Sequence, residues 1–148
     1  MTPHFGLMDA SKMSRVEAAL LRGQLHWRSG QRRLRQGKTA LGLATLYDAL
    51  LSGLRWHILV NPGAAMVGPA VADLENDAYV FARAEKAGLF ASPEDALRIQ
   101  TLAEAALYEA LRPSDQEWFV AELERVLTRI KFLPFPDASL PPEDPATD

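Results

Sequence analysis

The chain of 148 residues is long enough for one domain with a sizeable core, whereas two domains would be cramped. Its hydrophobic fraction of 48% and charged fraction of 24% match ordinary soluble domains, and the absence of cysteine excludes disulfide scaffolds, thiolate nucleophiles and cysteine-ligated metal clusters. The net charge is −3, but it is unevenly distributed: residues 1–60 hold nine bases and three acids, a net +6, and the remaining residues hold seven bases and sixteen acids, a net −9. The negative charge of the second part opposes a general affinity for nucleic acids.

The N-terminal region combines a non-periodic start with a strong helix signal. Residues 1–13 show no periodicity, and we expect them to form a flexible leader. A capping box, Ser14 to Glu17, then predicts the start of a helix, and Gly37 predicts its end. One stripe of this helix alternates large and small residues, among them Gly23 and Gly30. Each interior glycine costs about 1 kcal/mol relative to alanine, so these two indicate that another helix approaches closely.

The second predicted helix, from about residue 39 to 60, is apolar nearly all round. A helix without a wide polar face is usually central in a bundle or lies in a subunit interface. Together with Gly23 and Gly30 on the first helix, this predicts a homodimer. Residues 61–69 form a loop by their Asn, Gly and Pro content.

Three further helices are expected before a polar end. The third spans about residues 70–86 with Ala78, Phe81 and Glu85 at helical spacing, and Gly88 ends it. The fourth begins at the cap Ser92 and continues to about residue 111, with Leu107 and Ala110 facing inward. The fifth begins at a second capping box, Ser114 to Glu117, and is halted by Pro134.

The organisation follows from these elements. No segment alternates apolar and polar residues as a strand does, so the predicted fold class is all-α, an up-and-down bundle of about five helices over residues 14–133. Residues 134–148 hold five of the ten prolines and four acids, and we expect a Pro-rich acidic tail that joins no core. No stretch reaches the roughly 18 uncharged apolar residues that a membrane span needs, so a cytoplasmic location is expected.

Candidate site residues are basic. Arg28, Arg32 and Arg35 are spaced four and three apart, so their guanidinium groups share one face of the first helix. Such a face can pair with phosphates or carboxylates, because each arginine offers a planar fork of donors. The alternative is a solvated face partly paired with the acidic half of the chain. Nucleic acid is a partner that the chain allows but does not favour, because an aromatic stacking surface is missing.

The three histidines do not suggest a metal site, and no cofactor is indicated. None lies three or four residues from another histidine or a suitably placed glutamate, as converging ligands would. His57 shares a helical face with leucines, which favours a mostly buried side chain with one hydrogen-bond partner. An alternative site would combine Arg55 and His57, but residues two apart point about 200° away from each other around a helix, so they could cooperate only across a dimer interface.

The segment RLRQGKTALGLATLYDALLSGLRWHIL, residues 33–59, with Tyr47 in its middle and three helices after it, resembles the HEPN superfamily of small prokaryotic helical proteins. The resemblance implies a bundle, usually dimeric, that pairs with a nucleotidyltransferase or acts as a ribonuclease. Ribonuclease members carry Arg, four to six residues, then His. Here Arg22 to His26 encloses three residues and Arg55 to His57 encloses one, so no catalytic residue transfers.

These observations predict a non-catalytic helical binding or regulatory module, dimeric, with a nucleotidyltransferase-type protein as a candidate partner. The alternative is an RNA- or nucleotide-processing enzyme whose site is assembled across a dimer.

Overall fold

The computed structural model describes residues 13–61 and 74–143 and shows a bundle of helices. The helices are α1 (Arg15–Arg35), α2 (Thr39–Val60), α4 (Asp77–Lys86), α5 (Pro93–Ala105) and α6 (Pro113–Arg129), followed by the short 3₁₀ helix η4 (Asp137–Ser139). No strand is present in these two ranges. The prediction of an all-α bundle of five helices is confirmed.

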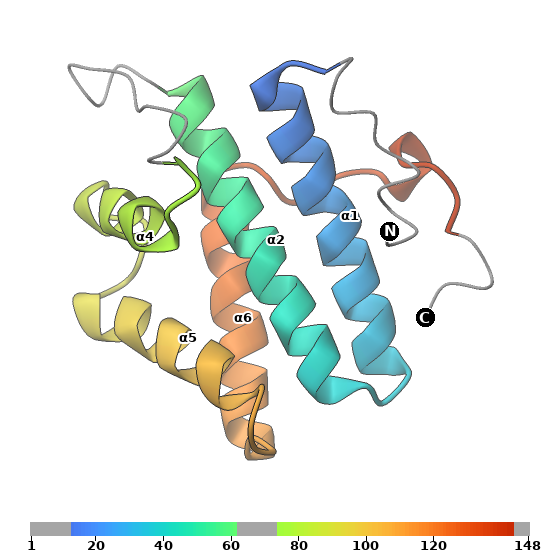
Figure 1. Ribbon diagram of the computed structural model, residues 1–148, viewed down its shortest axis with the longest axis vertical. Coiled ribbons are helices and arrows are strands. Elements are labelled where there is room, and N and C mark those ends of the chain that lie inside the picture. Colours follow the sequence, from blue (N-terminus) through green and yellow to red (C-terminus); the bar gives the residue numbers. More distant parts are fainter. Residues whose placement is uncertain (1–12, 62–73, 144–148) are drawn as a thin grey trace.

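Helix α2 is the centre of the bundle and packs against each of the other four helices. Figure 1 shows α1 beside it on one flank, α4 and α5 on the other, and α6 behind it. The apolar character of α2 follows from this position, since residues on several of its sides are buried, among them Leu46, Ala49, Leu51 and Ser52. None of the helices in the described part of the chain combines the length and the apolar character that crossing a bilayer requires.

Helices α1 and α2 approach each other through reciprocal notches. A Cβ atom on Gly30 of α1 would lie 2.6 Å from Cδ2 of Leu46 on α2, and one on Gly42 of α2 would lie 2.8 Å from Cδ2 of Leu34 on α1. Each glycine therefore leaves the space that a leucine of the other helix fills. Gly23 faces the Phe132 ring and Ser52 in the same way. The close approach that Gly23 and Gly30 predict is thus made within one chain.

The helix signals in the first half of the sequence correspond to the structure. Ser14 Oγ accepts a hydrogen bond from the Glu17 N–H at 3.1 Å, and Glu17 Oε1 accepts one from the Ser14 N–H at 3.3 Å, which completes the predicted capping box. Gly37 ends the helix region with φ +78°. Three residues then connect α1 to α2.

The third predicted helix begins too early. The expected leader and residues 62–73 lie outside the described residues, but the chain leaves the helical path at Glu75 and Asn76, and α4 begins only at Asp77. The cause is Asn76, whose side-chain oxygen accepts a hydrogen bond from the Tyr79 N–H at 3.2 Å and so caps a new helix. In α4, Phe81 is buried as expected, whereas Ala78 and Glu85 are exposed.

The fourth and fifth helices also differ from prediction, and α6 ends at Arg129 rather than at Pro134, because Lys131 adopts φ +64°. Helix α5 ends at Ala105 rather than near residue 111, because the N–H groups of Leu107 and Tyr108 bond to carbonyl groups three residues earlier and tighten the last turn. Leu107 is 60% exposed, so its inward assignment was wrong, and Ala110 is exposed as well. In α6, Pro113 occupies the first turn after the cap residue Arg112, which places Ser114 inside the helix, and the second capping box does not form.

Part of the predicted tail packs onto the bundle. The Phe135 ring lies 5.9 Å from the Phe132 ring at an interplanar angle of 74°, and Leu140 is 7% exposed. Figure 1 shows this segment leaving α6, passing behind α2 and α1 and ending beside α1. The expectation of a tail without core contacts was wrong for residues 134–143, because Phe135 and Leu140 supply apolar anchors between the prolines.

Candidate ligand-binding site

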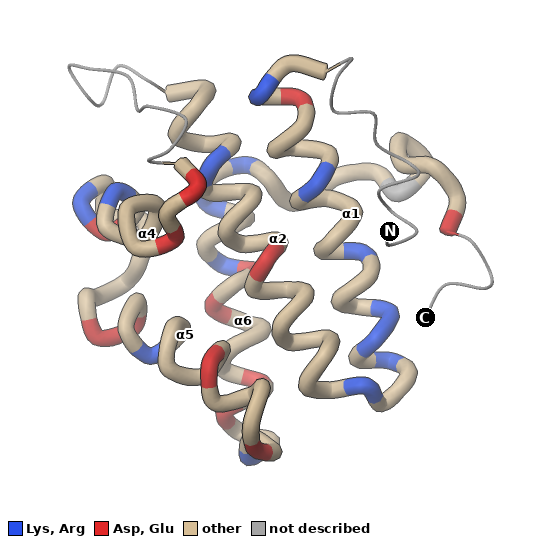
Figure 2. Tube along the Cα trace, in the orientation of Figure 1, with Lys and Arg blue, Asp and Glu red and all other residues tan. Residues whose placement is uncertain are grey.

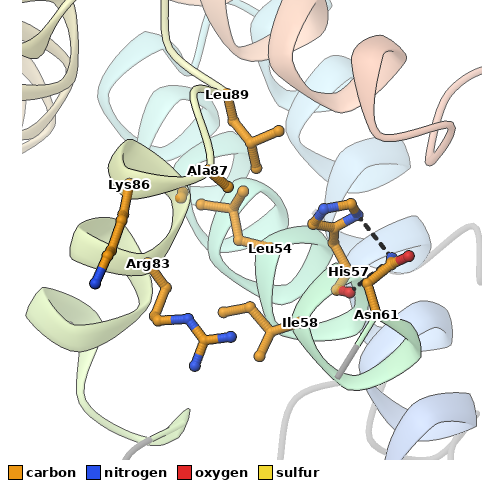
Figure 3. Close-up of a pocket in the computed structure, with 9 residues that line it drawn as sticks. Leu54, His57, Ile58, Asn61, Arg83, Lys86, Ala87 and Leu89 are labelled. Carbon is orange, nitrogen blue, oxygen red and sulfur yellow. Dashed lines mark hydrogen bonds between the residues drawn. The ribbon is translucent and has the colours of Figure 1, made fainter. Parts of the chain in front are cut away.

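A pocket of about 270 Å³ opens between the end of α2 and α4 (Figure 3). Its floor is apolar, and polar side chains stand on two opposite walls. The residues that line it are Leu54, His57, Ile58, Asn61, Arg83, Ala84, Lys86, Ala87 and Leu89. The cavity is slightly smaller than the about 300–1,000 Å³ of common small-molecule sites, so it fits a compact ligand.

Local sequence explains how the walls are placed. On α2, the lining residues follow the spacing of one helical face, with Leu54 one turn before His57 and Ile58 in the last turn and Asn61 just beyond it. On the other side, Gly88 adopts φ +73°, a value that glycine tolerates, and reverses the chain after α4. The N–H of Leu89 then bonds to the Ala84 carbonyl at 3.0 Å, which brings the Leu89 side chain back over the pocket.

His57 and Asn61 form one polar wall. Asn61 Nδ2 donates to the His57 carbonyl at 3.0 Å and lies 3.2 Å from His57 Nδ1. In the neutral ring that accepts this bond at Nδ1, the proton sits on Nε2. Burial lowers the pKa of His57, because the cationic ring is less well solvated there. The sequence predicts a mostly buried His57 with one hydrogen-bond partner. In the structure His57 is half-buried, its lowered pKa favours the neutral ring, and its partner is Asn61.

Arg83 forms the opposite wall, and Lys86 stands beside it. Figure 3 shows the Arg83 side chain extending from α4 toward Ile58, while Lys86 extends along the outer side of α4. Arg83 Nη1 donates to the Tyr79 hydroxyl at 2.8 Å, and its guanidinium carbon lies 5.8 Å from the centre of the Tyr79 ring. This contact holds the guanidinium group, with its five N–H donors, at the pocket.

The positive charge of the pocket favours an anionic ligand. Among the lining residues that the structure describes, two are cations and none carries a carboxylate. A bound anion would meet Arg83 on one wall and the Nε2–H of His57 on the other, above an apolar floor, while the amide hydrogens of Asn61 are used in its contacts with His57. Such a pocket can hold a small molecule with an apolar body and one anionic head group. Across residues 13–61 and 74–143, no group of three or more His, Asp or Glu side chains is placed to hold a metal ion.

The predicted anion-binding face of α1 is partly covered by the chain itself. Figure 2 shows basic residues along the second half of α1, on the side where the C-terminal segment ends. Glu143 Oε1 lies 2.7 Å from Arg32 Nη1 and 3.5 Å from Arg28 Nε, and the two arginine side chains are only 11% and 13% exposed. Arg35 lies in the last turn of α1 and is exposed. The structure thus brings Arg28 and Arg32 together around one carboxylate.

The alternative pair of Arg55 and His57 is not brought together within the chain. Arg55 Nε donates to the Leu74 carbonyl at 2.6 Å, and its Nη2 donates to Asp77 Oδ1 at 2.7 Å, so this side chain ties α2 to the start of α4. His57 instead contacts Asn61 and lines the pocket described above. The two residues belong to different contacts.

A larger hollow of about 580 Å³ lies over Tyr47, Asp48, Asp77 and Glu104 and is acidic. Burial, followed by the nearby charges of Asp77 and Asp48, raises the pKa of Tyr47 to about 12. Burial also raises the pKa of Asp48, although Arg22 opposes this shift. The Tyr47 ring stacks on the Phe81 ring with centroids 5.9 Å apart. This hollow repels anions, and the aromatic residue noted in the sequence resemblance serves to pack α2 against α4.

The sequence alone identified His57 but not its pocket. No sequence motif includes Arg83, Asn61 or Lys86. The pocket also depends on the chain reversal at Gly88, and a helix stop signal predicts the end of a helix but not the direction of the chain after it. No family model, no curated protein and no solved structure matches this chain.

Proposed function

We propose that the chain is a non-catalytic binding module whose pocket between α2 and α4 takes a small amphipathic anion, such as a medium-chain aliphatic carboxylate. One observation carries this proposal: an apolar floor lies between Arg83 on one wall and His57 with Asn61 on the other, and the described lining residues include no carboxylate. An aliphatic tail would bury against Leu54, Ile58 and Leu89, and the head group would accept hydrogen bonds from the Arg83 guanidinium.

The proposal is tested by calorimetric titration of the protein with octanoate, octanol and octylamine, which share a chain length and differ in head-group charge. We expect octanoate to bind, octanol to bind at least tenfold more weakly and octylamine not to bind. Tenfold corresponds to the loss of about one hydrogen bond to a charged group. Equal affinity for octanoate and octanol would show that Arg83 does not recognise the head group, and absence of octanoate binding would refute the site.

Two variants separate the charge of the pocket from its volume. Arg83→Gln removes the charge that faces the cavity and should weaken octanoate binding at least tenfold. Arg129→Gln, an exposed arginine at the end of α6, removes the same charge elsewhere and should leave binding unchanged. Ala87→Leu adds side-chain volume at a lining position and should weaken octanoate and octanol alike. An Arg83→Gln variant that binds octanoate as tightly as the parent would contradict the proposal.

Two expectations about partners stay predictions. The homodimer is predicted by the sequence, but Gly23 and Gly30 have their contacts inside the chain, so light scattering at high micromolar concentration is the direct test. The nucleotidyltransferase-type partner is implied by the HEPN resemblance, and copurification of a protein of that class would support it.

A further inference from the structure

The C-terminal segment, residues 134–143, covers the arginine surface of α1, which we define as Arg28 and Arg32. Both side chains are nearly buried, and the Glu143 carboxylate that faces them is 28% exposed. Arg32 Nη1 donates a charge-assisted hydrogen bond to Glu143, of a kind about twice as strong as a neutral one, and Arg28 adds an ion pair at 3.5 Å. The surface therefore already binds a carboxylate, supplied by the chain itself.

The described contacts of the segment that supplies this carboxylate lie outside the main core cluster once the chain has passed Phe135. Within the described residues, its backbone hydrogen bond runs from the Ser139 N–H to the Pro136 carbonyl at 3.0 Å and so closes on the segment itself. The Ser139 hydroxyl donates to the same carbonyl at 2.6 Å. Beyond Phe135, the contacts of the described residues with the bundle include Leu140, which is buried outside the main core cluster, and Glu143. Residues 136–143 can therefore leave the surface without opening the helical core.

The composition of the segment suits a peptide ligand as well as an intramolecular cover of the arginine surface. Pro134, Pro136, Pro141 and Pro142 restrict the backbone toward extended conformations, so little conformational entropy is lost when such a segment binds. An acidic, proline-containing peptide from another protein would offer α1 the same chemistry. Nucleic acid fits less well, because the chain has a net charge of −3 and its acids outnumber its bases.

We propose that the arginine surface of α1 is a docking site for an acidic, proline-containing segment of a partner protein, and that residues 140–143 of this chain occupy it as an intramolecular competitor. The partner must displace Leu140 and Glu143 before it binds. The apparent affinity for the partner is then lower than the intrinsic affinity by the fraction of molecules in which the surface is uncovered. This inference is independent of the pocket between α2 and α4.

The experiment uses a fluorescently labelled synthetic peptide with the sequence of residues 134–148 as the probe and measures its anisotropy with full-length protein. A release variant, Leu140→Ser with Glu143→Gln, uncovers the arginine surface while the helices stay intact. It should bind the peptide at least tenfold more tightly than the parent, and the affinity should fall as salt is raised. Equal affinity of the parent and the release variant would refute the competitor.

Variants of the arginine surface test the docking site itself. Adding Arg28→Gln and Arg32→Gln to the release variant should abolish peptide binding, whereas adding Arg35→Gln should leave it nearly unchanged, because Arg35 is exposed beyond the contact with Glu143. Circular dichroism checks folding, and if the double glutamine change unfolds the protein, Arg28→Lys with Arg32→Lys keeps the charge but loses the planar fork and should weaken binding. Undiminished binding by either double variant would refute the docking site. Tighter binding of a single-stranded RNA of matched charge than of the peptide would overturn the assignment to a protein partner.

Discussion

Replacing Gly30 by alanine tests the close approach of α1 and α2. The new Cβ would lie 2.6 Å from Cδ2, 2.7 Å from Cγ and 3.1 Å from the backbone nitrogen of Leu46, all closer than ordinary van der Waals contact. Leu46 is fully buried, so its side chain has little room to move. Overpacking of this kind costs about 1–3 kcal/mol, while the gain in helix propensity is about 1 kcal/mol. We expect no gain and a net loss of up to about 2 kcal/mol in the free energy of unfolding.

A double-mutant cycle with Leu46→Ala tests the same contact. Leu46→Ala alone should cost about 2–5 kcal/mol, because it leaves a cavity in the core. In that background the Gly30→Ala methyl group no longer meets Leu46 Cδ2 or Cγ, so its penalty should shrink by at least about 1 kcal/mol. Urea denaturation followed by circular dichroism measures all four proteins. Stabilisation by Gly30→Ala in the parent, or additive effects of the two changes, would show that the helices are not in close contact at this notch.

Three further predictions concern titrating groups and activity. Because burial lowers the pKa of His57, the unfolded chain takes up a proton at this residue before the folded chain does as pH falls below about 6.5. The free energy of unfolding should therefore fall with pH, and it should fall less steeply in His57→Gln. Parallel curves of stability against pH for the two proteins would contradict this. Hydrogen bonds from Arg98 and then Arg112 lower the pKa of Asp115, so its contribution to stability is present near neutral pH and lost in acid, and the stability of Asp115→Asn should depend less on pH below about 4. Purified protein should not cleave structured or unstructured RNA, and cleavage that His57→Ala abolishes would support the enzyme alternative instead.

Local signals explain which parts of the fold were predictable from the sequence. The capping box at Ser14 and the turn at Gly37 depend on residues within four positions, and both boundaries of α1 were correct within two residues. The apolar character of α2 indicated either a central position or a subunit interface, and the structure shows the central position. By contrast, helix propensity alone predicts that α5 continues through its alanines and leucines. It ends earlier because the chain tightens into a turn after Ala106.

The candidate sites were less predictable because they join distant segments. Arg28 and Arg32 were recognised as an arginine face, but their carboxylate comes from Glu143, which lies 111 residues beyond Arg32. Nothing in the spacing of a proline-rich acidic segment indicates where it will pack. His57 was recognised as a residue with one polar partner, but the pocket needs Arg83 of another helix, and the orientation of α4 depends on the cap at Asn76.

The two longest helices are neighbours in the sequence as well as in space, and this sets the order in which we expect the protein to fold. Three residues join α1 to α2, so closing this helical hairpin costs little loop entropy. Helix α6 contacts α2 across more than fifty intervening residues, so bringing these two helices together costs more loop entropy, and Leu127 then fills the space left by Gly53. We expect contacts such as Gly30 with Leu46 to be formed in the folding transition state and those of Leu127 to form later. Substitutions in the hairpin should therefore slow folding, and Leu127→Ala should mainly accelerate unfolding.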